Sequence, residues 1–519
     1  MGKYLGLDSS TQSLTGLVID ADEQSIDAEI SINFDAHFAE QYGVENGVIE
    51  LEQGAVHSAP LMWAEALDLL FATLRSEGVA LEDISAIGGS GQQHGTVYLN
   101  AAASRALAEL DPQRSLADQL ETIFSRATSP IWMDTSTGAQ CGEIEAAVGG
   151  RDRLLDLTGN TAFERFSGPQ IRKFFQTEPE LYARTDYIGL VSSYIASLLA
   201  GKLVGVDPGD ASGTNMMNIR SRQWDPIALE ATAPGLNDRL LAVAPSGQFV
   251  GTISPYFTAR YGIAPNCAIL PFSGDNPCSA IGLGLIEPGK VALSLGTSDT
   301  LFACMDEPRV SRTGEGCVFA LPDGHNYMAL ICFLNGSLAR EAVRDEYGLD
   351  WNGFTAALRA TQPGNSGALM LPFFDPEIVP RVPKANVVRH QLDPADTNAN
   401  VRAVVEAQAL SSRIHARWMG VDITSLYVTG GASANRDILR VYADVHNCPV
   451  YQFETTNSAA LGAALCAAQA DRRTNWQDTV APFTRPAGSA IQPESAAVAT
   501  YARCMDEYAV LERAHVVEA

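Results

Sequence analysis

A carboxylate in a glycine-containing turn, Asp275, is the sharpest candidate for chemistry in this sequence. It lies in Ser273-Gly-Asp-Asn276, directly before Pro277. A carboxylate in such a turn could act as a general base and take a proton from an attacking hydroxyl group. The structural alternative is a helix cap, because Asp is favoured at the N-cap and Pro in the first helical turn. The local sequence leaves both interpretations open.

Two segments of similar pattern, residues 4–11 and 291–300, could bind phosphate. In each, alternating apolar residues lead into a turn of small hydroxyl and carboxyl residues, and apolar residues then resume, as in a β-hairpin. Backbone N–H groups and hydroxyls in such turns can contact a phosphate, and the carboxylate of Asp8 could hold a metal ion. Taken singly, Asp8 and Thr297 could be turn residues bonded to their own backbone. Their recurrence indicates two related lobes that grip a polyphosphate.

Three polar residues stand between glycines in residues 88–95, where Gln92, Gln93 and His94 follow a predicted strand. A lone histidine is more often a structural residue with its hydrogen bonds satisfied. Three polar side chains in one glycine-rich loop fit a binding loop better than a core, and they could converge on sugar hydroxyls.

Other candidates have equally plain structural alternatives. Arg165 stands between two aromatic residues and could be a surface arginine paired with Glu164. Trp351 could pack in a core or cover an adenine ring. Gly430 and Gly431 follow an apolar run, where a backbone without side chains lets a flat ligand approach closely, or where a simple turn ends a strand.

Composition excludes several classes of function. Against 35 Lys and Arg the chain has 61 Asp and Glu, and this formal net charge of −26 repels nucleic acid and anionic membranes. No segment has the pattern of an export signal or a membrane span. The nine cysteines include no C-x-x-C pair, which is typical of reduced thiols in a cytoplasmic protein.

The length of 519 residues predicts two domains. Residues 3–34 have the pattern of three strands, residues 52–75 carry a helical apolar stripe, and residues 83–89 form another strand, so the first part is an α/β lobe. We expect lobes at 1–265 and 266–519, with an insertion near 101–129. The small residues of 457–467 predict a tightly packed helix beneath a nucleotide floor.

Taken in order, six motifs resemble the FGGY family of carbohydrate kinases. They are the hairpin at Asp8, the loop ending Gly-Gln-Gln-His-Gly95, Ile131-Trp-Met-Asp-Thr-Ser-Thr-Gly-Ala-Gln-Cys141, the turn ending Ser-Gly-Asp-Asn276, the hairpin containing Leu-Ser-Leu-Gly-Thr297 and the turn ending Thr-Gly-Gly-Ala-Ser433. Within the family the chain most resembles the members that phosphorylate D-xylulose, in particular the longer kind found in animals.

The resemblance implies a two-lobed actin-like ATPase fold of the α/β class, with a ribonuclease-H-like sheet in each lobe and the active site in the cleft. It implies ATP and Mg²⁺, D-xylulose as the sugar, residues 1–265 as the sugar-binding lobe and 266–519 as the nucleotide-binding lobe, and a monomer or homodimer. The implied residues are Asp275 as general base; Gln93, His94, Arg165, Asp275 and Asn276 for the sugar; Thr11, Gly296, Thr297, Trp351, Gly430, Gly431 and Asn435 for the nucleotide; and Asp8 for the metal.

Two departures from the family pattern stand out. Asp299-Thr300 occupies positions where many relatives continue with smaller or apolar residues, and residues 101–129 carry no family motif. Alternatives also remain: a family member acting on ribulose, gluconate or glycerol, an actin-like or chaperone-like ATPase without a sugar substrate, and a non-catalytic sugar sensor. The sensor is disfavoured because the acidic and hydroxyl residues needed for transfer are present.

Overall fold

The chain forms two compact units in the computed structural model, which describes residues 2–453, 457–486 and 488–516. Unit 1 comprises the described residues of 1–286, 319–327 and 457–484, and unit 2 those of 287–318, 328–456 and 485–519. The boundary expected near residue 265 does not coincide with this division, since residues 266–286 and 457–484 lie in unit 1.

Unit 1 is built on one mixed sheet with the strand order β12-β13-β6-β1-β2-β3, and β14 lies alongside β6. β1 and β2 form an antiparallel hairpin, whereas β6 runs parallel to β1 on the other side. β13 and β14 both run parallel to β6. The bounds are β1 Lys3–Ser9, β2 Ser13–Asp20, β3 Ser25–Asn33, β6 Ile84–Gly91, β12 Gly251–Thr252, β13 Ala268–Ile269 and β14 Ser273–Gly274.

Unit 2 repeats this arrangement in a sheet of order β17-β18-β16-β15-β23-β24. β15 pairs antiparallel with β16 and parallel with β23, and β23 is parallel to β24. The bounds are β15 Lys290–Leu295, β16 Asp299–Met305, β17 Cys317–Ala320, β18 Tyr327–Phe333, β23 Ser425–Thr429 and β24 Val450–Gln452. The hairpin predicted twice from sequence therefore forms in both units, each time beside a parallel strand.

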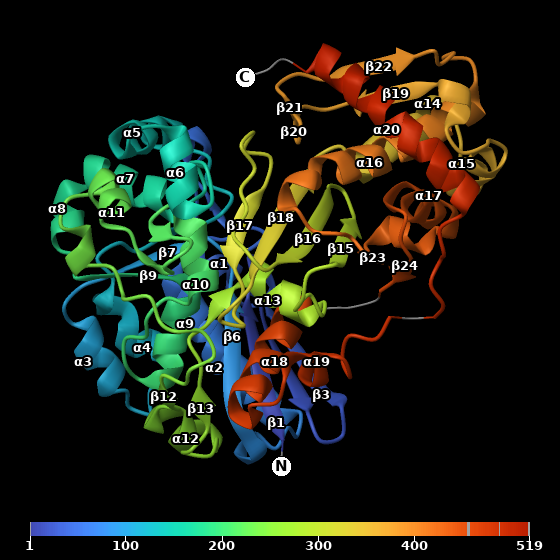
Figure 1. Cartoon of the computed structure of the whole chain (residues 1–519). Helices are drawn as coiled ribbons and strands as arrows, with labels where there is room; N and C mark the ends of the chain where they lie inside the picture. The colour runs from blue at the N-terminus through green and yellow to red at the C-terminus, as the bar shows by residue number, and fades with distance from the viewer. Residues whose placement is uncertain (1, 454–456, 487, 517–519) are drawn as a thin grey trace. The chain divides into compact units, whose positions relative to one another are not determined.

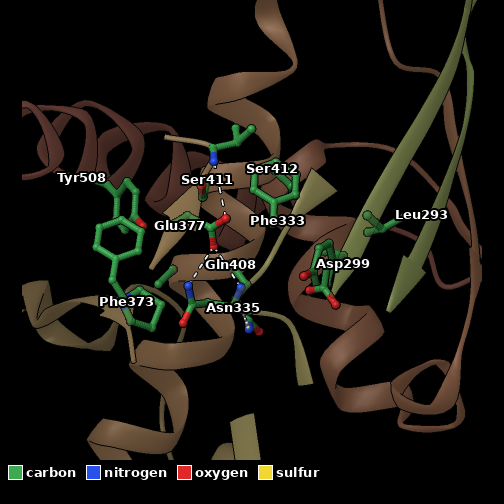
Figure 2. A pocket seen from close by; sticks show the side chains of 14 residues that line it. Leu293, Asp299, Phe333, Asn335, Phe373, Glu377, Gln408, Ser411, Ser412 and Tyr508 are labelled. Carbon is green, nitrogen blue, oxygen red and sulfur yellow. Dashed lines mark hydrogen bonds between the residues drawn. The ribbon is translucent and has the colours of Figure 1, made fainter. Parts of the chain in front are cut away.

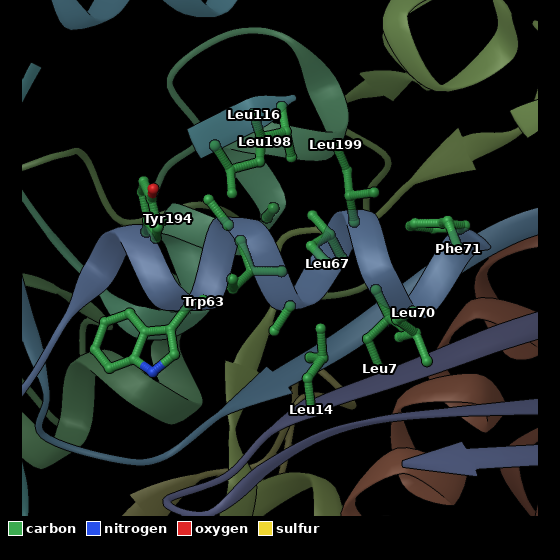
Figure 3. Packing of buried hydrophobic residues seen from close by; sticks show 14 of the residues in the cluster. Leu7, Leu14, Trp63, Leu67, Leu70, Phe71, Leu116, Tyr194, Leu198 and Leu199 are labelled. Carbon is green, nitrogen blue, oxygen red and sulfur yellow. The ribbon is translucent and has the colours of Figure 1, made fainter. Parts of the chain in front are cut away.

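The apolar stripe predicted in residues 52–75 belongs to α2, Pro60–Ser76, which begins later than expected. Pro60 stands in the first helical turn, where its missing N–H costs nothing, and a short strand precedes it. Figure 3 shows the buried side chains of α2, among them Trp63 and Leu67, packed between Leu7 and Leu14 of the hairpin and residues of α9, Val191–Ala200. This core supports the turn that follows β1.

The region expected as an insertion, residues 101–129, contributes to the same core. It forms α3, Ala103–Ala108, and α4, Leu116–Leu120, and the side chains of Leu107, Leu116 and Leu120 join the α2 cluster. It is therefore packed into the body of unit 1.

The helix of small residues is α18, Ser458–Arg472, and it lies in unit 1, where it packs against β1, β6 and α13, Asp275–Gly282. In Figure 1 this C-terminal helix stands beside the N-terminal strands. The contact is so close that a β-carbon on Gly6 would lie 1.9 Å from the carbonyl oxygen of Ala460. The prediction of a tightly packed helix is confirmed, because glycines of β1, β6 and α13 give α18 its close contacts, whereas its place beneath a nucleotide stays a prediction.

In the described part of the chain, no helix combines the length and the apolar character that crossing a membrane requires.

Candidate active site

The first candidate residue, Asp8, lies near the carboxyl end of β1, next to the parallel strand β6. Its Oδ1 accepts a hydrogen bond from the Ser90 hydroxyl at 2.7 Å. Burial raises the pKa of Asp8 to about 6, although the bond from Ser90 acts in the opposite direction. Asp8 is thus a strand residue held by the neighbouring strand, not a turn residue bonded to its own backbone.

Asp275 is the first residue of α13, directly after β14, and Gly274 occupies the N-cap position. The Asp275 Oδ1 accepts from the backbone N–H of Asn276 at 2.7 Å and from the Asn276 side-chain amide at 2.9 Å. The interpretation of Asp275 as the N-cap is therefore wrong.

Burial and the nearby charge of Asp8 raise the pKa of Asp275 to about 7. A carboxyl group that titrates near neutral pH is both available as a base and basic enough to take a proton in a transition state. The two aspartates are therefore coupled: ionisation of one disfavours ionisation of the other.

Gln93 joins the glycine-rich loop to the start of α13. Its Oε1 accepts from the Asn276 amide at 2.8 Å, and its Nε2 donates to the carbonyl oxygen of Gly209 at 3.3 Å. Gln92, its neighbour, is buried, and neither of its side-chain amide atoms has a hydrogen-bond partner among the described residues. Of the two glutamines, only Gln93 connects the candidate residues.

His94 is held in a defined tautomer. Its backbone has a φ of 74°, a strained value for a non-glycine residue, and its ring stacks on Phe166 with centroids 4.3 Å apart. Its Nδ1 lies 2.6 Å from the carbonyl oxygen of Gly213, which can only accept, so Nδ1 carries the proton. Burial and the charge of Arg165 lower the pKa of His94 to about 3, so the ring is neutral at pH 7 and its Nε2 is a hydrogen-bond acceptor.

Arg165 is half-buried, with its guanidinium 5.7 Å from the centre of the Phe163 ring. No ion pair between Arg165 and Glu164 occurs in the described part of the chain, whereas the half-buried side chain fits an arginine with a buried stem. Thr11 lies in the turn after β1, and its hydroxyl accepts from the indole N–H of Trp132 at 2.8 Å. Thr11 is in unit 1, apart from the other predicted nucleotide residues, which are all in unit 2.

A short polar segment, residues 207–214, was missed by sequence reasoning. The buried carboxylate of Asp207 caps α10, Pro208–Ala211, and accepts from the hydroxyls of Ser273 at 2.7 Å and Ser246 at 2.6 Å. The same segment supplies the two carbonyl groups that hold Gln93 and His94. Asp-Pro at 207–208 is a cap signal that could have been noticed, whereas backbone carbonyls leave no trace in a sequence.

Unit 2 places the remaining hairpin and the glycine pair side by side. Gly296 and Thr297 form the turn between β15 and β16, and Gly430 follows the parallel strand β23. Gly430 has a φ of 85°, and a β-carbon there would lie 2.6 Å from the carbonyl oxygen of Leu295. A β-carbon on Gly431 would have no atom within 4 Å. The backbone at the ends of β15 and β23 is therefore exposed to close approach by a ligand.

Trp351 and Asn435 begin two neighbouring helices of unit 2. Trp351 is the first residue of α15, Trp351–Arg359, and is 41% exposed, so it is not a core residue. The Arg344 guanidinium lies 4.6 Å from the centre of its ring. Asn435 caps α17, Arg436–His446, and donates to the Thr355 hydroxyl of α15 at 2.8 Å. Asn435 thus fixes the position of α15 relative to α17.

No cluster of three or more His, Cys, Asp or Glu side chains suited to a metal ion occurs among the residues that the structure describes. Mg²⁺ does not require such a cluster, because it is often held by one or two carboxylates together with phosphate oxygens and water. The carboxylate of Asp8 fits that mode of binding.

The chain is similar in sequence to known proteins over nearly its whole length. The N-terminal domain model of the FGGY family of carbohydrate kinases matches residues 121–282, and the C-terminal domain model matches residues 291–470. The chain is 42% identical over 524 residues to a xylulose kinase of Rattus norvegicus, covering 98% of this chain and 96% of that protein.

Solved structures confirm the predicted fold class. A xylulose kinase from Rhodospirillum rubrum has a TM-score of 0.82 at 19% identity, and a gluconate kinase from Lactobacillus acidophilus has a TM-score of 0.81 at 19% identity; each comparison covers 99% of this chain and 98% of the other. Since enzymes with different named substrates match equally well, the fold does not identify the sugar.

Proposed function

Because the chain belongs to the FGGY family of carbohydrate kinases, we propose that it transfers the γ-phosphate of ATP to D-xylulose and forms D-xylulose 5-phosphate. The observation that carries the choice of sugar is the 42% identity to the rat xylulose kinase over nearly the whole of both chains. In support of the sugar site, four of its predicted residues, Gln93, His94, Asp275 and Asn276, are held by hydrogen bonds to one another or to residues 207–214.

In this proposal unit 1 binds the sugar and unit 2 binds the nucleotide. Asp275 takes the proton of the terminal sugar hydroxyl as that oxygen attacks the γ-phosphorus. The neutral Nε2 of His94 accepts a hydrogen bond from another hydroxyl, Arg165 donates to sugar oxygens, and the side-chain oxygen of Asn276 accepts from a sugar hydroxyl. Phosphoryl transfer depends mainly on alignment and charge stabilisation, so rigid placement of these groups is the main contribution of the protein.

On the nucleotide side, the turn at Gly296 and Thr297 contacts the γ-phosphate, Gly430 and Gly431 line the nucleotide backbone, and Trp351 with Asn435 borders the base. Thr11 contributes a hydroxyl from unit 1. Asp8 would hold Mg²⁺, which supplies neutralisation of phosphate charge when it is bound.

The protein is proposed to act in the cytoplasm as a monomer or homodimer.

One experiment tests the function: ADP release with D-xylulose, D-ribulose, D-gluconate, glycerol or no sugar, on the parent and on Asp275→Asn. We expect D-xylulose to give the highest kcat/KM, and Asp275→Asn to lower kcat by about 10²- to 10⁴-fold, the range of general-base assistance.

The matched control is Asp225→Asn, which changes another buried aspartate of unit 1 that caps α11, Pro226–Thr232. Asn is an equally good cap, so its activity should equal that of the parent. Equal turnover of D-ribulose would refute the choice of sugar, and ATP turnover indifferent to every sugar would favour the ATPase alternative. A loss below twofold in Asp275→Asn would contradict its role as base.

A further inference from the structure

Asp299 has a specific partner within unit 2. It is the first residue of β16 and directly follows the turn formed by residues 296–298. Its two carboxylate oxygens accept hydrogen bonds from Nη1 and Nη2 of Arg340, both at 3.0 Å. Arg340 is entirely buried. A buried, two-point pair of this kind defines position and orientation together.

Arg340 lies on α14, Ser337–Glu346, and this helix also touches the turn itself. The backbone N–H of Ser337 donates to the carbonyl oxygen of Gly296 at 2.8 Å. A β-carbon on Gly336 would lie 2.7 Å from the backbone oxygen of Thr297, so the loop before α14 rests directly against the turn. The first turn of α14 thus holds both ends of residues 296–298.

The loop that precedes α14 is itself anchored. The Glu377 carboxylate accepts from the backbone N–H groups of Leu334 at 2.7 Å and Asn335 at 2.9 Å. Gln408 of α16, Thr397–His415, donates to the carbonyl oxygens of Asn335 and Gly336, each at 2.8 Å, and accepts from Arg340 at 2.7 Å. Figure 2 shows Glu377, Gln408 and Asn335 joined by these bonds, with Asp299 facing the same cavity. The network therefore connects the turn to the body of the unit.

We propose that Asp299 and Arg340 are positioning residues that hold the backbone of residues 296–298 in the geometry that receives the nucleotide phosphate. The proposal rests on the proposed function of that turn. Neither side chain touches the nucleotide: the ion pair is buried behind the turn, and it acts through Gly296 and Thr297.

The geometry of the ion pair explains why a positive charge at position 340 is not enough to hold Asp299 in place. A lysine at position 340 would keep the charge but not the planar fork that matches a carboxylate at two points. Leaving one partner of a buried pair without the other is unfavourable, so the chain would move to solvate it. The turn at residues 296–298 directly precedes Asp299, so we expect that movement to displace the turn.

The test is nucleotide binding without sugar, measured by isothermal titration calorimetry with ATP and Mg²⁺ on the parent, Arg340→Lys and Asp299→Asn. We expect Kd to rise at least about tenfold in both variants, because loss of a single hydrogen bond to a charged phosphate has that scale. The Kd for D-xylulose should stay within about twofold of the parent. In the double variant the increase in Kd should be no greater than in the worse single variant, since both changes break one interaction.

The matched control is Arg402→Lys, which alters another buried arginine of unit 2. Arg402 pairs with Glu406 at 3.2 Å and, within the described ranges, makes no hydrogen bond to residues 296–299 or to Arg340. It should lower stability without changing Kd for the nucleotide, which separates positioning from general loss of structure.

Folded Arg340→Lys with an unchanged nucleotide Kd would overturn the proposal, as would a control variant that weakens binding equally. Should Arg340→Lys fail to fold, as judged by circular dichroism, Asp299→Asn decides by the same criterion. Sugar-dependent ADP release by the parent tests the proposed function separately. If D-xylulose were the wrong sugar, the nucleotide-binding test of Asp299 and Arg340 would still be valid.

Discussion

At the scale of single residues, the pair of carboxylates Asp8 and Asp275 determines how the proposed reaction depends on pH. Asp275 acts as a base only when it is ionised, and its pKa is about 7. The value of kcat/KM for D-xylulose should therefore rise with pH through a limb near pH 7 and level off above it, since this parameter reports groups of the free enzyme.

The same coupling predicts a shift in that limb. Asp8→Asn removes the neighbouring charge that raises the pKa of Asp275, so the limb should move to lower pH even where the absolute rate falls. Rate measurements between about pH 5 and 9 check this, with Asp225→Asn as the control that should keep the parent profile. A parent limb near the usual aspartate pKa of about 4 would contradict the assignment of Asp275 as the titrating base.

The pH dependence of stability has the opposite sign. Because the folded-state pKa of Asp275 is raised above its unfolded value, the folded chain binds the proton more tightly. This contribution to the free energy of unfolding is complete below about pH 4 and is lost as pH rises through about 7.

The resemblance to the FGGY family was enough to predict three side chains of unit 1 that meet. Gln93, Asn276 and Asp275 are linked as expected from the glycine-rich loop and the turn before α13. The carbonyl groups of Gly209 and Gly213 could not be predicted, because a backbone acceptor has no side-chain signal and its partner is more than a hundred residues away. The pKa shifts follow from burial, which only the packed structure defines.

At the scale of elements, the close packing of α18 on β1 depends on a glycine, which has no side chain, at the point of contact. A β-carbon on Gly6 would meet backbone atoms of Ala460, and backbone cannot turn aside as a flexible side chain can. Gly6→Ala should therefore lower the free energy of unfolding by about 1–3 kcal/mol or more, as overpacked cores do. Chemical denaturation followed by circular dichroism measures this loss.

Gly142→Ala is the matched control. Gly142 lies inside α5, Gly138–Val148, and a β-carbon there would have no atom within 4 Å. Because Ala favours a helix interior, this variant should be as stable as the parent or more stable by about 0.5–1 kcal/mol. Equal stability of Gly6→Ala and the parent would show that α18 can move away from β1 without cost.

Sequence patterns predicted the helices and strands better than they predicted which of these elements pack against one another. Alternation predicted both hairpins, and small residues predicted a tightly packed helix at 457–467, but nothing local indicated that α18 would pack against β1 and β6. The predicted range of residues 52–75 placed the start of α2 too early, because it took in the short strand β5, Val56–Ser58, that precedes Pro60. The position of α18 late in the chain therefore did not indicate that it packs on the sheet formed by the N-terminal strands.

At the scale of the whole molecule, the division of residues between the units predicts two separable binding responses. The sugar candidates His94, Arg165 and Asp275 lie in unit 1, whereas Gly296 and Gly430 lie in unit 2. A ligand stabilises the structure that binds it, by about 2.7 kcal/mol at a free concentration one hundred times its Kd. Amide hydrogen exchange that requires opening of the occupied site should slow by about one hundredfold.

D-xylulose alone should therefore protect amides near residues 93–94 and 273–276, and ADP alone should protect amides near residues 296–298 and 430–435. Amides of α5 serve as an internal control in unit 1, because α5 carries no predicted ligand contact. Mass spectrometry of exchanged peptides resolves the two units without any turnover. Protection by ADP confined to unit 1, or protection by D-xylulose confined to unit 2, would refute the assignment of ligands to units, because each ligand must stabilise the residues that contact it.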